Sequence, residues 1–316
     1  MNSTLTRLTN AVVARLMSTV VNPLIKAPTI SLTSREVADA VPVSVPTRHG
    51  DVRCYITRAA TGAPLATGAA GPPVHIHIHG GAFLSGVPRQ NDNLVRSIAG
   101  EVGATVVNVE YTKAPVARYP RAHEECYDVL RWVQRFGDVM GWDGARVSIS
   151  GVSAGGNLAL GALEQARLGG DPALRAGVLI VPAVDQTIPP EQYTSPLPPS
   201  AAEAHPPFVS PRLVRLSQEN YFADATRRAE PLASPVLNDA GIAALPPLLV
   251  VTAERDSIRA QDERFIDLAR AKGVSVTDHC MSGVGHGFPE SSKKEDEAAV
   301  REMAELVRVH LTAHLA

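Results

Sequence analysis

The stretch of sequence that decides the fold is RVSISGVSAGGN, residues 146–157. Its first part predicts a strand over 146–153, and the strand runs directly into a helix predicted over 154–168. The turn between them has the pattern Gly-x-Ser-x-Gly, with Ser153 at its centre. Such a strand-to-helix turn exposes the serine hydroxyl above the carboxyl edge of a sheet. We therefore expect a nucleophilic serine at position 153, with an ordinary glycine-rich turn as the alternative interpretation.

Outward from this turn, strand and helix patterns alternate along the chain. Two strands around a turn are predicted within 41–58. Further strands are predicted at 73–79, 104–111, 176–183, 246–254 and 275–281, and helices at 120–136, 259–272 and 291–315. Strands that alternate with helices imply a mostly parallel central sheet with helices on both faces, so the predicted fold class is α/β.

One segment interrupts this alternation. Residues 182–211 contain nine prolines, and a helical pattern follows at 211–222. A segment of this kind is too short to have a core of its own. We interpret 185–235 as an insertion that lies over the sheet, which divides the main domain into 41–184 and 236–316.

The N-terminal segment has its own pattern. Apolar residues recur there at spacings of three and four, namely Leu5, Leu8, Val12, Leu16 and Val20. This spacing predicts an amphipathic helix that packs on the body of the protein. Arg15 interrupts the apolar stretch, which argues against both a membrane span and a signal peptide. Arg7 and Arg15 provide too little positive charge to favour a membrane-surface role, so no stable membrane insertion is expected.

Composition excludes several classes of protein. The chain has 316 residues, 45% of them hydrophobic, and 30 basic against 32 acidic side chains give a net charge of −2. A disordered chain is excluded by this apolar content, and a general nucleic-acid binder by the absence of excess positive charge. Three cysteines lie far apart, at positions 54, 126 and 280. Reduced cysteines suit a cytosolic protein, so the expected location is cytoplasmic.

A glycine-rich turn follows the strand predicted at 73–79. Its sequence is HGGAF, residues 79–83. Gly80 and Gly81 let the backbone approach a ligand closely with its N–H groups free to donate. Together with the N–H of Ala154, this turn could form an oxyanion hole. A simple glycine turn between a strand and a helix is the alternative.

Two further side chains follow predicted strands. Asp256 comes after the strand at 246–254, and His286 comes after the strand at 275–281. Open α/β sheets place their sites in loops at this carboxyl edge. The order Ser153, Asp256, His286 is also the chain order of the α/β-hydrolase triad. A lone aspartate or histidine in a loop is usually structural, so the prediction depends on all three together.

A competing constellation is the alternation of His75, His77 and His79 along one strand. Side chains two apart share one face of a strand, and three imidazoles could bind zinc. Against a metal site, the pattern lacks the carboxylates that usually accompany such ligands. We expect His75 and His77 to be hydrogen-bonded interior residues, with His79 shaping the turn that follows, and we expect no metal.

Five motifs jointly resemble the hormone-sensitive-lipase-like group of α/β-hydrolases, the bacterial family IV esterases. HGGAF (79–83) lies about 70 residues ahead of GVSAGGN (151–157). YTKAP (111–115) is similar to that family's Y-R-L-A-P-E stretch, ERDSIR (254–259) to its E-x-D-P-L-R segment, and HGF (286–288) to its H-G-F. The resemblance covers roughly residues 40–316 and implies an α/β-hydrolase fold with a helical cap formed by 1–40 and 185–235.

The chain departs from the family pattern at several positions. Val152 replaces the usual aspartate after the first glycine of the serine turn, and Ala82 replaces the third glycine of the oxyanion turn. Thr112 and Val116 stand where the family has Arg and Glu, and Ser257 follows Asp256 in place of proline. Ala82 still has an N–H to donate. These changes affect supporting hydrogen bonds and leave the three triad residues intact.

The resemblance implies a serine carboxylesterase that acts on short- to medium-chain esters through an acyl-enzyme. Ser153 would be the nucleophile, His286 the base and Asp256 its orienting partner, with the oxyanion held by Gly81, Ala82 and Ala154 and the turn shaped by Gly80. No cofactor is required, the partner is a small-molecule ester, and family analogy suggests a homodimer. Alternatives are an amidase, arylformamidase or lactonase with the same triad, and a non-catalytic ligand-binding protein.

Overall fold

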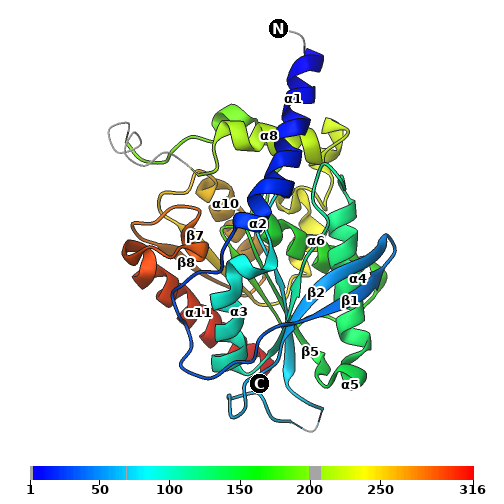
Figure 1. The fold of residues 1–316 in the computed structure, drawn as a ribbon, viewed down its shortest axis with the longest axis vertical. Coiled ribbons are helices and arrows are strands. Elements are labelled where there is room, and N and C mark those ends of the chain that lie inside the picture. Colours follow the sequence, from blue (N-terminus) through cyan, green and yellow to red (C-terminus); the bar gives the residue numbers. More distant parts are fainter. Residues whose placement is uncertain (1–2, 69, 199–207) are drawn as a thin grey trace.

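The computed structural model describes residues 3–68, 70–198 and 208–316 (Figure 1). Eight strands form one sheet, in the order β1-β2-β4-β3-β5-β6-β7-β8. Their bounds are β1 Val41–Thr47, β2 Gly50–Thr57, β3 Pro73–Ile78, β4 Thr105–Val109, β5 Asp143–Val152, β6 Ala176–Ile180, β7 Leu248–Ala253 and β8 Val276–Met281. β1, β2 and β4 pair antiparallel, and every other neighbouring pair is parallel. The predicted mostly parallel sheet is confirmed.

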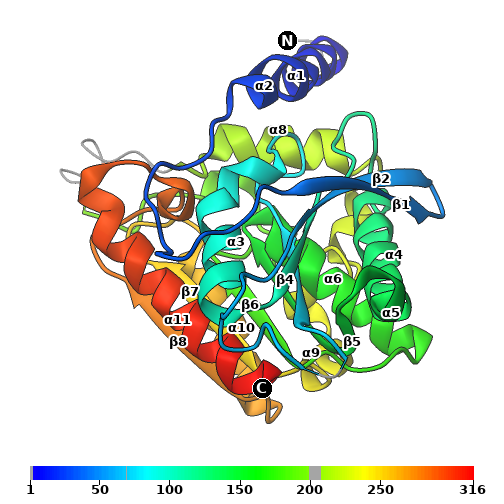
Figure 2. The same cartoon turned by 60° about the horizontal axis from the view of Figure 1, so that its bottom comes forward.

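Helices cover both faces of this sheet. Those of the main domain are α3 Asp92–Ser97, α4 Arg121–Arg135, α5 Gly137–Met140, α6 Ala154–Gly169, α9 Asp239–Ala243, α10 Arg259–Ala271 and α11 Glu297–Leu315. The buried side chains of α4, α6, α9 and α10 belong to one core cluster, and those of α3 and α11 belong to another. Figure 2 shows α11 and α3 on the opposite side of the strands from α4, α5 and α6.

Alternation along each strand supplies both cores. In β7, Leu248 and Val250 belong to the cluster under α6 and α10, whereas Leu249 and Val251 belong to the cluster under α11. All six residues of β7 are buried. A strand that is apolar on both sides is expected where helices cover both faces of a parallel sheet.

Two sequence predictions need correction, and one helix was not predicted. The strand expected at 176–183 ends at Ile180, because Val181 adopts a positive φ of 43° and turns the chain away from the sheet. The α-helix expected from 291 begins at Glu297, after a 3₁₀ turn at Lys294–Asp296. Ser291 Oγ accepts from the N–H of Lys293 and donates to Asp296 Oδ2 at this turn. Helix α3 was not predicted, because its six residues are too few to show a helical periodicity.

A separate group of helices lies over the carboxyl edge of the sheet. It consists of α1 Ser3–Leu16, a π-helical turn at Met17–Val21, α2 Asn22–Leu24 and α8 Pro211–Tyr221. Figures 1 and 2 show α1 beside α8, with α1 standing clear of the main body. Asn10 Nδ2 donates to Glu219 Oε2 of α8 at 2.6 Å. In the described part of the chain, no helix is long and apolar enough to span a bilayer.

The histidine row lies on β3 as predicted, inside the protein. His75 and His77 are fully buried on the face opposite to Ile76. His75 Nδ1 is 2.8 Å from Ser148 Oγ and its Nε2 is 2.6 Å from Ser150 Oγ, and His77 Nδ1 is 2.8 Å from the same Ser150 hydroxyl. The prediction that His75 and His77 are hydrogen-bonded interior residues is confirmed. Among the described residues there is no group of three or more His, Cys, Asp or Glu side chains that could hold a metal.

Candidate active site

Ser153 lies at the sharp turn between β5 and α6. Its φ of 54° and ψ of −118° are unusual for a residue with a side chain. Space explains why glycines flank it: a Cβ on Gly151 would run into the backbone oxygen of Gly155, and one on Gly155 would run into the backbone oxygen of Ile78. The sequence thus permits a turn that most residues would block, and the turn directs the serine side chain into a pocket.

Three side chains from separate loops meet at this turn. His286 Nε2 is 2.8 Å from Ser153 Oγ, and His286 Nδ1 is 2.6 Å from Asp256 Oδ2. Because the carboxylate can only accept, Nδ1 carries the proton and Nε2 is free to accept from the serine hydroxyl. The structure therefore brings together the three residues that the sequence singled out, in the arrangement of a nucleophile, a base and an orienting group.

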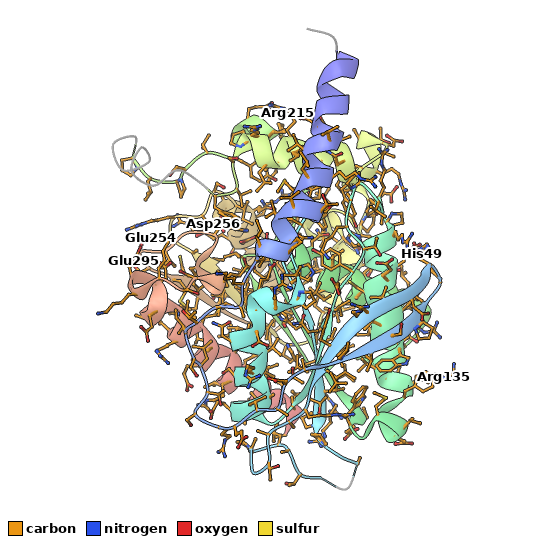
Figure 3. All side chains as sticks on the ribbon, in the orientation of Figure 1. His49, Arg135, Arg215, Glu254, Asp256 and Glu295 are labelled. Carbon is orange, nitrogen blue, oxygen red and sulfur yellow. The ribbon has the colours of Figure 1, made fainter. Side chains whose placement is uncertain are left out.

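Asp256 is held in a tight loop after β7. The residue is only 2% exposed, and Oδ1 accepts a hydrogen bond from the N–H of Ile258 at 3.1 Å. Ser257, which departs from the family's proline, donates its hydroxyl to the backbone oxygen of Val209 at 2.8 Å. Figure 3 labels Asp256 and its neighbour Glu254, which lies nearer the edge of the molecule. Ser257 therefore connects the aspartate loop to the segment that lies over the sheet.

The turn at 79–83 lies on the other side of Ser153. Gly81, Ala82 and Phe83 all have positive φ, at 129°, 52° and 61°. Within the described chain, no acceptor takes a hydrogen bond from the backbone N–H of Gly81 or Ala82. The N–H of Ala154 is the first of α6, where a helix leaves its amides without intrahelical partners. These three N–H groups remain available to a ligand. His79 Nδ1 lies 2.7 Å from the backbone oxygen of Gly80.

The departures from the family pattern have specific contacts. The backbone oxygen of Ala82 accepts from Ser217 Oγ of α8 at 2.8 Å, so the oxyanion turn is attached to the helix above it. Val152 is buried in the core beneath α3 and α11 and lines the pocket. Thr112 donates from its N–H and hydroxyl to Glu125, at 2.7 and 2.9 Å. Val116 is 68% exposed.

Asn157, at the end of the serine motif, supports the floor of the site. Its amide group donates to the backbone oxygens of Ala183 and Ala233, at 2.8 and 2.9 Å. This fixes the amide oxygen toward His123 Nε2, 2.8 Å away. Burial lowers the pKa of His123 to about 4, so the imidazole is neutral at pH 7 and its Nδ1 accepts from Tyr221 Oη at 2.9 Å.

A pocket of about 350 Å³ opens above Ser153. Its walls come from three parts of the chain: the N-terminal segment, α8 with the preceding loop, and the sheet edge. Most of the walls are apolar, with contributions from Met17, Val21, Ile25, Tyr193, Phe208, Val209, Leu213, Val214 and Ile258. Phe208 stacks on the His286 ring with centroids 5.9 Å apart. The pocket thus offers an apolar binding space directly over the hydroxyl.

Sequence reasoning missed several polar residues in these walls, Ser85 and Gln186 among them. Ser217, Gln90 and Glu290 all line the pocket. Glu290 follows His286-Gly287-Phe288 by two positions, so a search for titratable residues in the same turn would have found it. Gln90 and Ser217 have no comparable signal, since each is brought to the site by a loop or helix whose path the sequence does not determine.

The chain is similar to known esterases. The family model for the alpha/beta hydrolase fold matches residues 75–290. Esterase LipI of Mycobacterium tuberculosis is 30% identical over 227 residues, covering 71% of this chain and 68% of the relative. Hormone-sensitive lipase of Bos taurus is 39% identical over 83 residues, which cover 26% of this chain and 11% of the lipase.

Solved structures agree with this likeness. Carboxyl esterase 2 from the mycorrhizal fungus Tuber melanosporum superposes with a TM-score of 0.78 at 25% identity, and the match covers all of both chains. The family model matches more than half of the chain, and the structural match covers its full length. The chain therefore belongs to the alpha/beta hydrolase fold family, among the esterases that resemble hormone-sensitive lipase.

Proposed function

We propose that Ser153, His286 and Asp256 are the catalytic triad of this serine carboxylesterase, and that it hydrolyses short- to medium-chain esters through an acyl-enzyme. The observation that carries the proposal is the unbroken hydrogen-bonded series Asp256–His286–Ser153, with distances of 2.6 and 2.8 Å, at the base of an apolar pocket. A hydroxyl beside an oriented base becomes a nucleophile without any cofactor.

The first half of the reaction forms the acyl-enzyme. Ser153 Oγ bonds to the ester carbonyl carbon while its proton passes to His286 Nε2. The tetrahedral intermediate then collapses, the bond from carbon to the alcohol oxygen breaks, and the proton on Nε2 goes to that oxygen. Asp256 stabilises the imidazolium that exists between these two proton transfers.

The second half releases the acid. A water molecule gives a proton to His286 Nε2 while its oxygen attacks the acyl carbon, and collapse breaks the bond to Ser153 Oγ. The proton on Nε2 returns to the serine. In both halves the negative charge on the carbonyl oxygen faces the free N–H groups of Gly81, Ala82 and Ala154. Each such donor typically contributes about 10²–10³ in turnover.

We further propose that the segments 1–40 and 185–235 form a cap that limits the acyl chain, over a main domain made of 41–184 and 236–316. Both segments supply apolar pocket walls: Met17 and Val21 from the first, Leu213 and Val214 from the second. A pocket of about 350 Å³ is at the small end of the usual range for ligand sites, which favours short to medium acyl chains.

A series of p-nitrophenyl esters from acetate to laurate tests this function. We expect the highest kcat/KM at four to eight carbons, roughly the range a pocket of this size favours. Leu213→Ala should shift the optimum to longer chains by enlarging the pocket. Turnover that Ser153→Ala fails to abolish would contradict the mechanism. Matched esters and amides of one acid distinguish an esterase from an amidase.

The location and assembly of the protein are separate proposals. Cys54, Cys126 and Cys280 are all free, which supports a reducing compartment, and we propose the cytoplasm. Cell fractionation with an antibody to the chain tests it, and recovery in a secreted fraction would contradict it. The homodimer suggested by family analogy stays a prediction, for which sedimentation equilibrium is the direct measurement.

A further inference from the structure

Two separate turns of the chain carry the reacting groups. The oxyanion turn, taken through Val87 as residues 80–87, provides the N–H groups of Gly81 and Ala82. A second turn at 285–290 provides His286 and ends at Glu290. For catalysis the donors and the imidazole must keep a fixed distance from one another, because both act on the same carbonyl group. Gln90, in the short helical turn Pro88–Asn91 that follows the first of these turns, connects it to Glu290 of the second.

The pair is directly hydrogen bonded. Gln90 Nε2 donates to Glu290 Oε1 at 2.7 Å, and the same nitrogen lies 3.4 Å from the backbone oxygen of Gly80. The orientation of the amide is fixed by its other end, since the N–H of Val87 donates to Gln90 Oε1 at 2.9 Å. Gln90 is only 4% exposed. Its side chain thus binds both ends of the oxyanion turn, at Gly80 and Val87, and joins them to Glu290.

Gly80 lies between the pair and the nucleophile. A Cβ at this position would be 3.4 Å from Ser153 Cβ and 3.5 Å from Glu290 Oε1. The carboxyl group of Glu290 is therefore packed against the residue that borders the serine. Movement of the carboxyl would be transmitted to the oxyanion turn both through Gly80 and through Gln90.

The environment of Glu290 is unusual for a carboxyl group. Its pKa is raised by burial, while Gln90, His286 and Asn91 act in the opposite direction. Tyr111, after β4, is the other titratable group that faces it, and burial keeps the pKa of that phenol well above its usual range. A carboxyl group is costly to hold in such a place unless its hydrogen bonds serve the structure around it.

We propose that Glu290 is a positioning residue, which through Gln90 holds the oxyanion turn in register with the turn that carries His286. This role rests on the proposed function, because it concerns the geometry of the same reaction. Glu290 itself forms no bond with the substrate carbonyl. Its removal should loosen the donors relative to the imidazole, and a misplacement on the order of 1 Å can cost about 10²-fold in rate.

A double-mutant cycle tests the role. The variants are Glu290→Ala, Gln90→Ala and the two combined, with kcat and KM measured on p-nitrophenyl butyrate. We expect each single change to lower kcat by about 10- to 100-fold with KM altered by less than about 3-fold. The combined variant should be no slower than the slower single variant, since each change breaks the same connection.

Two further variants make the test specific. Glu290→Gln retains an oxygen that accepts from Gln90, so it should recover kcat to within about 3-fold of the unaltered enzyme. Glu295→Ala is the matched control: this carboxylate lies in the next turn, is 73% exposed and is near the edge of the molecule in Figure 3. It should leave kcat unchanged.

Each outcome is decisive for the proposal. Unchanged kcat in Glu290→Ala, multiplicative losses in the combined variant, or a Glu290→Gln as slow as Glu290→Ala would each overturn it. Thermal unfolding of every variant identifies a loss of kcat that arises from unfolding. If Glu290→Ala does not fold, the kcat values of Glu290→Gln and Gln90→Ala test the proposal in its place. An unaltered enzyme without esterase turnover would refute the proposed function instead, so the two failures are distinguishable.

Discussion

Two serine–histidine groups lie close together at the carboxyl end of β5 and differ in access and in partners. The interior group consists of Ser148, Ser150, His75 and His77, and the pocket group consists of Ser153 and His286. In the interior group, His75 Nε2 is 2.6 Å from Ser150 Oγ. In the pocket group, His286 Nε2 is 2.8 Å from Ser153 Oγ, only three residues further along the chain. Hydrogen-bond distance therefore does not distinguish a nucleophile from a structural serine.

The surroundings make the distinction. Ser150 is 1% exposed on a regular strand, and burial lowers the pKa of His75 well below its usual value. Ser153 lies on a backbone turn with positive φ and opens onto a pocket, and its histidine has a carboxylate partner in Asp256. Access, free N–H donors and an orienting carboxylate are what the interior group lacks.

The largest expected difference between the groups is in turnover. Ser153→Ala should lower kcat for p-nitrophenyl butyrate by about 10⁴–10⁶-fold, because it removes the hydroxyl that is hydrogen bonded to His286 Nε2. Ser150→Ala should change kcat by less than about 3-fold in the fraction that remains folded. Steady-state kinetics at equal concentrations of folded protein measure both. A large loss of kcat in folded Ser150→Ala would break the comparison.

A smaller difference is expected for the partners of the two histidines. Asp256→Asn leaves the imidazole in its pocket but favours the wrong tautomer, so kcat should fall by about 10²–10⁴-fold. Ser148→Ala removes the partner of His75 Nδ1, and kcat should stay within about 3-fold. Equal effects of the two changes on kcat would show that the carboxylate has no special role.

The sequence singled out Ser153, Asp256 and His286, which lie together in the structure, for a physical reason. The contact that demands glycine at 151 is local, since a Cβ there would meet the backbone oxygen of Gly155, and short motifs mark Asp256 and His286 at the ends of strands. Helix α3 and the residues Gln90 and Ser217 were not predictable in this way. Their positions depend on how distant loops and helices pack, which no local pattern encodes.

The segments that we propose as a cap illustrate the same limit. Their helices at 211–221 and near the N-terminus were predicted from periodicity, but the contacts between them were not. Asn10 reaches Glu219 across more than 200 residues, and Ser257 reaches Val209 across 48. Polar contacts of this kind have no spacing that a sequence reveals.

The interior group should make stability depend on pH. Burial lowers the pKa of His77 to about 4 in the folded protein, against a usual value of 6.5. The unfolded chain therefore binds more protons between these values, and stability falls as the pH decreases from about 6.5 to about 4. His77 alone accounts for about 3 kcal/mol over that range. Urea unfolding at pH 7, 6, 5 and 4 measures the loss.

A variant isolates this contribution. His77→Gln cannot titrate, so its free energy of unfolding should depend less steeply on pH, by about 3 kcal/mol over the same interval. The other histidines whose pKa burial lowers, His75, His79, His123 and His310, should keep the remaining dependence. An unchanged pH dependence in His77→Gln would contradict the assignment of a neutral interior histidine.

The smallest expected difference concerns stability at neutral pH. Ser150→Ala leaves His75 Nε2 and His77 Nδ1 without their common partner, which should cost about 1–3 kcal/mol. Ser153→Ala should change stability by less than about 1 kcal/mol, because pocket groups can be solvated. Chemical denaturation of both variants checks the pair. A larger loss of stability in Ser153→Ala than in Ser150→Ala would contradict this difference between the interior and pocket groups.

The most direct test of the central claim is the site of covalent labelling by a fluorophosphonate, read by peptide mass spectrometry after complete inactivation. A single adduct on Ser153, with Ser148 and Ser150 unmodified and no labelling of the Ser153→Ala variant, is the predicted result. An adduct on Ser148 or Ser150, or full inactivation with Ser153 unmodified, would contradict the account.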